Sequence, residues 1–258
     1  MLTIRYHLVI ILLCLGVLVG VSPVHATSLV KKTFMCLNCG HEYQDNAAAS
    51  TNTYGGQDSE FRLYAVGTQP VAYFIHTCPN CGFPHESSLF RPATAQKEIK
   101  IDDKEKLKIS NCLSAFCENN KVTPDSFTSC QKYEVLAEIH LLRGKPSLVI
   151  AEAYINAAWM ADDHAHQEKI VIYRLKAVDY LNQALAKKEI KADKVPIFTY
   201  LIGELYRRAG KFDQALESFS RVKTDDPQLE SLLKQQTELA RKKDTAKSFI
   251  KFSPNLEK

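Results

Sequence analysis

Four cysteines fall into two matching pairs whose spacing is that of a metal site. Cys36-Leu37-Asn38-Cys39-Gly40 and Cys78-Pro79-Asn80-Cys81-Gly82 each place two residues between their thiols. This spacing lets both sulfurs of a tight turn face one ion, and the glycine after each pair permits the positive φ that such a knuckle uses. The sequence therefore predicts one structural Zn²⁺, held by Cys36, Cys39, Cys78 and Cys81.

A zinc ion with four protein thiolates has no position left for a water nucleophile, so this metal is not expected to catalyse a reaction. His41 and His85 follow the knuckles closely and are candidates to replace a thiolate or to support one by a hydrogen bond. Because four cysteines already complete the tetrahedron, we favour ligation by the cysteines alone.

Redox chemistry is the competing interpretation, because a CxxC pair can act as a dithiol switch and an oxidising compartment favours disulfides. Neither pair begins an evident helix, whose dipole would lower a thiol pKa, and the motif is duplicated in matching form with its glycine. Structural zinc is favoured. Disulfides, or a thiol-disulfide redox protein that uses the CxxC pairs, stay open as alternatives.

Three further cysteines, Cys112, Cys117 and Cys130, lie beyond the knuckles. Four residues separate Cys112 from Cys117, which makes a bridge between them feasible across a turn or a bent helix. No function follows from this spacing.

The 38 residues between Cys39 and Cys78 exceed the spacing of a compact zinc ribbon. An inserted loop containing Asp58, Arg62 and Tyr64 must fit between the knuckles, either as a working surface or as solvated padding. We favour padding, because polar loops usually lie on the surface.

No constellation of catalytic residues is evident. The stretch from Ala161 to Lys169, ADDHAHQEK, has metal-ligand residue types, but between two helices it more naturally forms a cap and a solvated first turn. The chain contains no HExxH, GxSxG, phosphate-binding glycine loop or dinucleotide fingerprint. We therefore expect a protein that is not an enzyme, with no catalytic residues.

The N-terminus has the pattern of a secretory signal. Arg5 precedes a 14-residue apolar run, and Val24-His25-Ala26 fits a cleavage site, so residues 1–26 are predicted to be a signal peptide and the protein to be exported, periplasmic or otherwise extracytoplasmic. Fourteen helical residues span only about 21 Å, short of a bilayer core of roughly 30 Å. An uncleaved inner-membrane anchor is the second choice, and membrane contact is expected only in that case.

The 258-residue chain carries a formal charge of only +4 and a single tryptophan, which gives no signature of nucleic-acid binding. Residues 27–91 are rich in turns, with short runs such as Val71–Ile75 that predict strands, and residues 92–129 indicate a connecting segment with one short helix. Residues 130–258 have helical periodicity. Its apolar stripes are Tyr133, Leu136, Ala137 and His140; Val149, Ala153 and Ala157; and Val171, Leu175, Val178, Leu181 and Leu185.

One stretch within the helical part has the spacing of a tetratricopeptide repeat. Counted from Gly203, the residues Tyr206, Gly210, Ala215, Phe219 and Pro227 fall at offsets 3, 7, 12, 16 and 24. Stacked repeats bury faces that a single repeat cannot, so we expect five or six helices packed as one body. Such arrays often present a concave surface, which predicts a protein or peptide partner that binds through the helical repeats.

The fold class predicted is mainly α: a tetratricopeptide-like antiparallel helical array preceded by a small β zinc-ribbon-like head. The combination of CLNCGHEY, DSEFRLYAVGTQPVAYFIHTCPNCGFP, AEAYINAAWMADD and YLIGELYRRAGKFDQAL resembles the bacterial family catalogued as domain of unknown function 2225. By that resemblance the four knuckle cysteines correspond to the paired cysteines of the family and the helical half to its tetratricopeptide-like portion. The resemblance does not supply an activity for this chain. Typical members look cytoplasmic, whereas this chain has an export signal.

Overall fold

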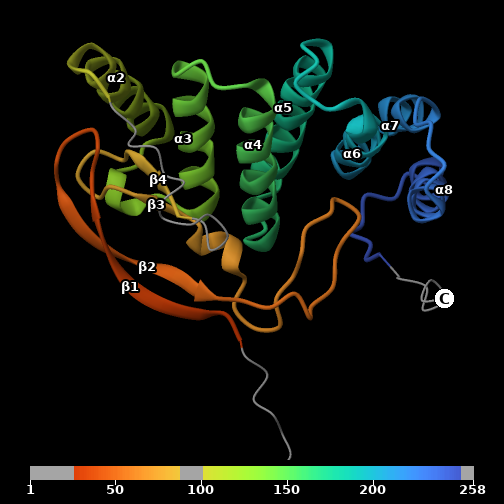
Figure 1. The fold of residues 1–258 in the computed structure, drawn as a ribbon, viewed down its shortest axis with the longest axis horizontal. Coiled ribbons are helices and arrows are strands. Elements are labelled where there is room, and N and C mark those ends of the chain that lie inside the picture. The colour runs from red at the N-terminus through yellow and green to blue at the C-terminus, as the bar shows by residue number, and fades with distance from the viewer. Residues whose placement is uncertain (1–25, 88–100, 251–258) are drawn as a thin grey trace, which may run out of the picture.

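The structure is a computed structural model that describes residues 26–87 and 101–250. Apart from Ala26, the predicted signal peptide lies outside these residues. Within these residues, two small antiparallel hairpins lead into a row of seven α-helices (Figure 1). The elements are β1 (Ser28–Met35), β2 (Glu42–Ser50), β3 (Ile75–Thr77), β4 (Pro84–Glu86), α2 (Asp103–Asn120), α3 (Ser129–Leu142), α4 (Ser147–Asp163), α5 (Gln167–Ala186), α6 (Val195–Arg208), α7 (Phe212–Ser220) and α8 (Pro227–Arg241). No helix within the described residues has both the length and the apolar character needed to cross a bilayer.

The head consists of two separate two-stranded sheets. β1 pairs with β2 in antiparallel register, with Phe34 opposite Tyr43, and β3 pairs with β4. The strand predicted at Val71–Ile75 is wrong over most of its length. A 3-10 helix from Pro70 to Tyr73 occupies it, because proline fixes φ near the helical value and has no N–H for a sheet, and β3 begins only at Ile75.

The segment expected to connect head and body carries α2, an 18-residue helix rather than a short one. Asp102 begins the helix by accepting a hydrogen bond from the Glu105 N–H at 2.8 Å. Its buried residues Ile109, Leu113 and Phe116 pack in one apolar cluster with the β-strands and the first knuckle. The segment therefore supplies a wall of the head.

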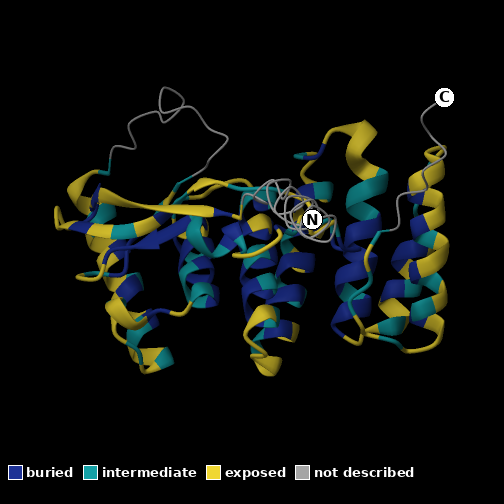
Figure 2. Ribbon diagram, turned by 90° about the horizontal axis from the view of Figure 1, so that it is seen from below, coloured by how far each residue is buried: buried dark blue, intermediate teal, exposed yellow. Residues whose placement is uncertain are grey.

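Helices α3 to α8 confirm the predicted array of about six helices, and successive helices pack side by side (Figure 1). The buried residues face the neighbouring helices, as Figure 2 shows in dark blue. The first predicted stripe, from Tyr133 to His140, is buried. In α5 the predicted apolar stripe is wrong at its first residue, because Val171 is exposed while Ile170 and Tyr173 are buried.

Helices α6, α7 and α8 form the predicted repeat. Gly203 lies against Phe219 across the α6–α7 contact, Gly210 turns the chain with φ +74°, and Pro227 occupies the first turn of α8. Ala215 is completely buried. Each position of the sequence pattern thus has the mechanical role that its residue type predicts.

We expect Gly203→Ala to destabilise the array by about 1–3 kcal/mol, because the added Cβ would lie 2.5 Å from two ring carbons of Phe219. Urea denaturation measures the loss. Adding Phe219→Leu removes those ring atoms, so the double variant should lose less than the sum of the two single variants. Strictly additive losses would contradict a steric cause.

Candidate metal centre and adjoining groove

The four knuckle sulfurs lie together at one end of the head, all within 4.8 Å of one another. Two of the separations join different knuckles: Cys36 Sγ to Cys81 Sγ is 3.6 Å and Cys39 Sγ to Cys78 Sγ is 3.7 Å. Metal–sulfur bonds of about 2.3 Å place the sulfurs of a tetrahedron roughly 3.8 Å apart. The cluster therefore fits one tetrahedral ion.

Both knuckles have the same backbone geometry. In the first, the Cys36 N–H donates to the His41 carbonyl at 2.9 Å and the Gly40 N–H donates to the Cys36 carbonyl at 2.9 Å. The second repeats these bonds, from Cys78 to the Phe83 carbonyl at 3.0 Å and from Gly82 to the Cys78 carbonyl at 2.7 Å. Gly40 and Gly82 have φ values of +74° and +77°, which confirms the role predicted for the glycines.

This arrangement of paired cysteines and helices has a counterpart among known sequences. A sequence model of the family described as an uncharacterised protein conserved in bacteria, domain of unknown function 2225 (DUF2225), matches residues 29–245. The chain belongs to the DUF2225 family. Comparison with curated proteins and comparison with solved structures gave no match.

Two asparagines of this DUF2225 chain add hydrogen bonds that sequence reasoning missed. Asn38 Nδ2 donates to Cys81 Sγ at 3.8 Å, and Asn80 Nδ2 donates to Cys39 Sγ at 3.5 Å. Each amide thus reaches from its own knuckle to a sulfur of the other. The signal was present in the sequence, because asparagine precedes the second cysteine in both motifs.

The sulfurs perturb one another electrostatically. The hydrogen bond with Cys81 lowers the pKa of Cys36 to about 5 and raises the pKa of Cys81. Burial raises the pKa of Cys78 to about 11. A divalent cation would stabilise all four sulfurs as thiolates, so its binding releases protons.

The histidines that follow the knuckles stand outside the cluster of sulfurs. Among the described residues, the only group of three or more potential ligands close enough for one ion is the four cysteines. His41 is exposed, and His85 packs edge-on against Phe34 at 5.0 Å, where burial lowers its pKa. The predicted preference for the cysteines over either histidine thus agrees with the geometry.

A third histidine, His76, is buried and links the two hairpins. Its Nδ1 lies 3.0 Å from Asp45 Oδ2 in β2, and its Nε2 lies 2.8 Å from Ser87 Oγ after β4. The ring stacks on Phe34 with a centroid separation of 4.3 Å. Asp, His and Ser in this order resemble a hydrolase triad, but His76 is 0% exposed, so its contacts support an internal link.

The remaining sequence candidates have other roles. Cys112, Cys117 and Cys130 are free thiols, so the feasible bridge between Cys112 and Cys117 is not formed. In the stretch from Ala161 to Lys169, Asp162 accepts from Arg208 Nη2 at 2.9 Å. This carboxylate is therefore part of an ion pair between α4 and α6.

The prediction that the inserted loop is solvated padding is wrong. Asp58, Ser59, Glu60 and Arg62 are each at most 2% exposed. Glu60 receives two hydrogen bonds from Arg174 of α5, at 2.6 and 3.1 Å, and one from the Trp159 indole of α4 at 3.1 Å. The loop enters the helical body and is held there by buried charges.

Neighbouring loop residues make similar contacts. Arg62 forms a two-fold ion pair with Asp163, at 2.8 and 2.6 Å. Ser59 donates to Glu204 Oε1 of α6 at 2.6 Å and receives the Tyr200 hydroxyl on its carbonyl at 3.0 Å. A signal was available: Arg174 and Glu204 fall on apolar helical faces, where a lone charge would cost too much without a buried partner.

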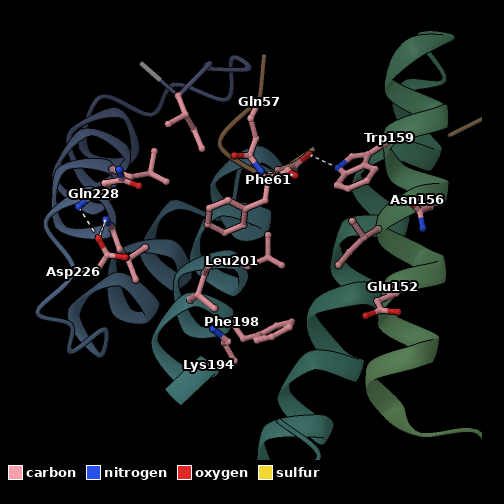
Figure 3. A pocket seen from close by; sticks show the side chains of 16 residues that line it. Gln57, Phe61, Glu152, Asn156, Trp159, Lys194, Phe198, Leu201, Asp226 and Gln228 are labelled. Carbon is pink, nitrogen blue, oxygen red and sulfur yellow. Dashed lines mark hydrogen bonds between the residues drawn. The ribbon is translucent and has the colours of Figure 1, made fainter. Parts of the chain in front are cut away.

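The insertion also contributes to a groove in the helical array. This groove is a cavity of about 620 Å³ between α4, α6 and α8, and its lining includes Gln57, Glu60 and Phe61 of the insertion as well as Ile250 (Figure 3). Its volume is in the range of ligand-binding clefts. The segment between the two cysteine pairs therefore forms part of a cleft in the helical body.

This connection predicts that the metal affects the groove. Chelation should free the two ends of the insertion, loosen Glu60 and move Trp159, the only tryptophan, into a more polar setting. We expect a red shift of tryptophan emission on chelation that zinc addition reverses. In the Glu60→Gln variant, chelation should cause a smaller red shift of tryptophan emission. An emission spectrum of the wild type that does not change on chelation would contradict the coupling between the metal and the groove.

Proposed function

We propose that this DUF2225 protein is an exported, non-enzymatic zinc-binding protein whose helical repeats bind a segment of a partner protein. The observation that carries the proposal is the groove itself. It is lined by three helices of the array and by the insertion that the two cysteine pairs enclose. The metal in the head would then help to fix the shape of the binding groove in the helical body.

The sulfur geometry supports structural zinc over CxxC redox chemistry. All four sulfurs of the two knuckles lie within 4.8 Å of one another, the arrangement of a tetrahedral metal site, whereas a CxxC dithiol needs only the two sulfurs of one knuckle. Four thiolates would hold zinc with Asn38 and Asn80 as hydrogen-bond donors around them. The ion would supply cross-linking of the two knuckles, and the chain's own residues would provide the binding surface.

Metal and oxidation state are tested together by native mass spectrometry of the mature protein from the exported fraction, purified without added metal. We expect one zinc per chain and four thiols that become reactive only after chelation and denaturation. Metal-free protein with the four knuckle cysteines in disulfides would overturn the zinc assignment and favour the redox alternative. Protein found only in the cytoplasm would overturn export.

Partner binding is tested by a photoreactive amino acid placed in the full chain at three positions. Phe198 lines the groove, Val30 lies exposed on β1, and Ile172 is an exposed control on α5 outside the groove. We expect a discrete cross-linked protein from position 198 in living cells and none from position 172. No discrete adduct from position 198 would refute binding by the helical repeats, and an adduct from position 30 alone would assign the partner to the head instead.

A further inference from the structure

The chain itself covers part of the face that α4, α6 and α8 share. After α8, residues 244–250 run back across the C-terminal turns of α6 and α4, where Lys247 pairs with Asp162 at 3.3 Å. Arg207 donates to the carbonyls of Asp244 and Ala246 at 2.6 and 3.1 Å. The face therefore already holds an extended segment through main-chain carbonyls.

The insertion lies beside residues 244–250 and is joined to them by backbone hydrogen bonds. The Ser59 N–H donates to the Ser248 carbonyl at 2.9 Å, and the Ile250 N–H donates to the Gln57 carbonyl at 2.8 Å. Asp58 and Phe249 thus form an antiparallel bridge. Gln57 and Ile250 also line the open cavity, so the cavity continues the face on which the extended segment lies.

The cavity, which is the part of this face that residues 244–250 leave open, is lined mainly by apolar side chains. Its walls include aromatic and aliphatic side chains from every element around it, among them Phe61, Ile155, Trp159, Ile197, Phe198 and Leu229 (Figure 3). Side chains of this kind favour bulky apolar groups, since burial contributes roughly 25 cal/mol per Å² of apolar surface.

The charged groups of the lining are either paired or exposed to solvent. Glu60 is bound by Arg174, whereas Asp226 is exposed and accepts the N–H groups at the start of α8, and the side chain of Lys194 is 61% exposed, 3.5 Å from the neighbouring Asp193. Glu152 also has an interaction within the chain. A charged ligand group would be desolvated here without a dedicated partner, so the lining complements an uncharged ligand.

Two amides on opposite walls remain available. Asn156 of α4 and Gln228 of α8 line the cavity, and the side chain of neither forms a hydrogen bond within the part of the chain that the structure describes. An amide offers both a donor and an acceptor, which are the groups that the main chain of an extended peptide requires.

We propose that this cavity binds an extended, uncharged segment of a partner protein. Bulky aliphatic or aromatic side chains of that segment lie on the apolar walls, and its main chain bonds to Asn156 and Gln228. The proposal rests on the proposed function and adds to it the site and the chemistry of the partner.

The test is selection from a phage-displayed library of random 12-residue peptides on the full, zinc-loaded protein. We expect enrichment of uncharged sequences with at least two bulky apolar residues. Synthetic peptides of the enriched sequences should bind Phe198→Glu at least tenfold more weakly, and Asn156→Leu several-fold more weakly, by fluorescence anisotropy. Ile172→Glu, an exposed apolar position outside the cavity, is the matched control and should bind as the wild type does.

Several outcomes would overturn the inference: no enrichment, enrichment of charged peptides, or equal binding by Phe198→Glu and the control. Peptide binding that strengthens tenfold when the chain ends at Ile250 would instead identify residues 251–258 as the occupant. A dimer that Phe198→Glu dissociates would identify a second copy. Discrete cross-links from Phe198 without any peptide enrichment would leave the proposed function standing and refute the extended, uncharged segment, whereas cross-links from Val30 alone or from neither position would refute both.

Discussion

We expect Cys78→Ser to bind no zinc, against the one ion per chain expected for the wild type, and to unfold the head. Cys78 is completely buried and belongs to the apolar cluster of Phe34, Tyr43 and α2. A structural zinc site contributes about 10–16 kcal/mol of binding free energy in small domains, which is comparable to the whole stability of an ordinary domain, about 5–15 kcal/mol. Zinc stoichiometry by native mass spectrometry and the unfolding profile by calorimetry measure the two effects.

The matched control is Cys112→Ser, which changes a partly buried cysteine packed on the same cluster but outside the group of four sulfurs. It should keep one zinc and unfold close to the wild type. In Cys78→Ser the core formed by α3, α4 and α5 should persist, because that core is a separate apolar cluster. A full complement of zinc in Cys78→Ser would contradict the four-cysteine site.

Local patterns predicted the knuckles and the repeat because a few adjacent residues determine each geometry. The glycine after each cysteine pair needs only its own positive φ, and Gly203 needs only the ring sixteen positions later. The same reasoning failed for the insertion. A loop rich in polar residues is usually solvated, and nothing near Glu60 in the sequence shows that its partner Arg174 lies 114 residues away.

The evidence for that contact lay in the helices and not in the loop. Arg174 interrupts the buried face of α5, three positions before Ala177 and four before Val178, where an unpaired guanidinium would be prohibitively costly. Periodicity identifies only the apolar residues of a stripe, here Val171 to Leu185, and does not indicate which segment neutralises a charged residue beside them. Buried charges on a helical face therefore indicate a distant acidic segment, although the sequence does not say which.

The contact between Glu60 and Arg174 carries the other large expected effect. Glu60→Ala should lower the free energy of unfolding by about 3–5 kcal/mol, because it removes the carboxylate that accepts both hydrogen bonds of Arg174, which is 0% exposed, and leaves it only Asp162 at 3.7 Å. Urea denaturation followed by Trp159 emission measures the change at the site itself, since Trp159 donates to Glu60.

Two variants distinguish the stability lost to an unpaired charge from the stability lost to poorer packing. Glu105→Ala removes the partner of Arg143 in a partly exposed pair 2.7 Å apart and should cost less than about 1 kcal/mol. Glu60→Leu combined with Arg174→Met removes both buried charges and should recover most of the stability lost in Glu60→Ala. No recovery in that double variant would show that shape, and not charge, dominates the contact.

The pH dependence of stability gives an independent check on the same pair. Burial by itself would raise the pKa of Glu60, but the charge and hydrogen bonds of Arg174 outweigh it and the pKa is lowered. A carboxyl whose pKa is lower in the folded state stabilises the fold above its unfolded pKa, near 4.3, and loses that contribution as the pH falls through the folded value. The stability gap between the wild type and Glu60→Gln should therefore be constant from pH 7 to 5 and narrow only in stronger acid. A gap that narrows already between pH 7 and 5 would mean that Glu60 is protonated in the neutral fold, and that Arg174 does not neutralise it.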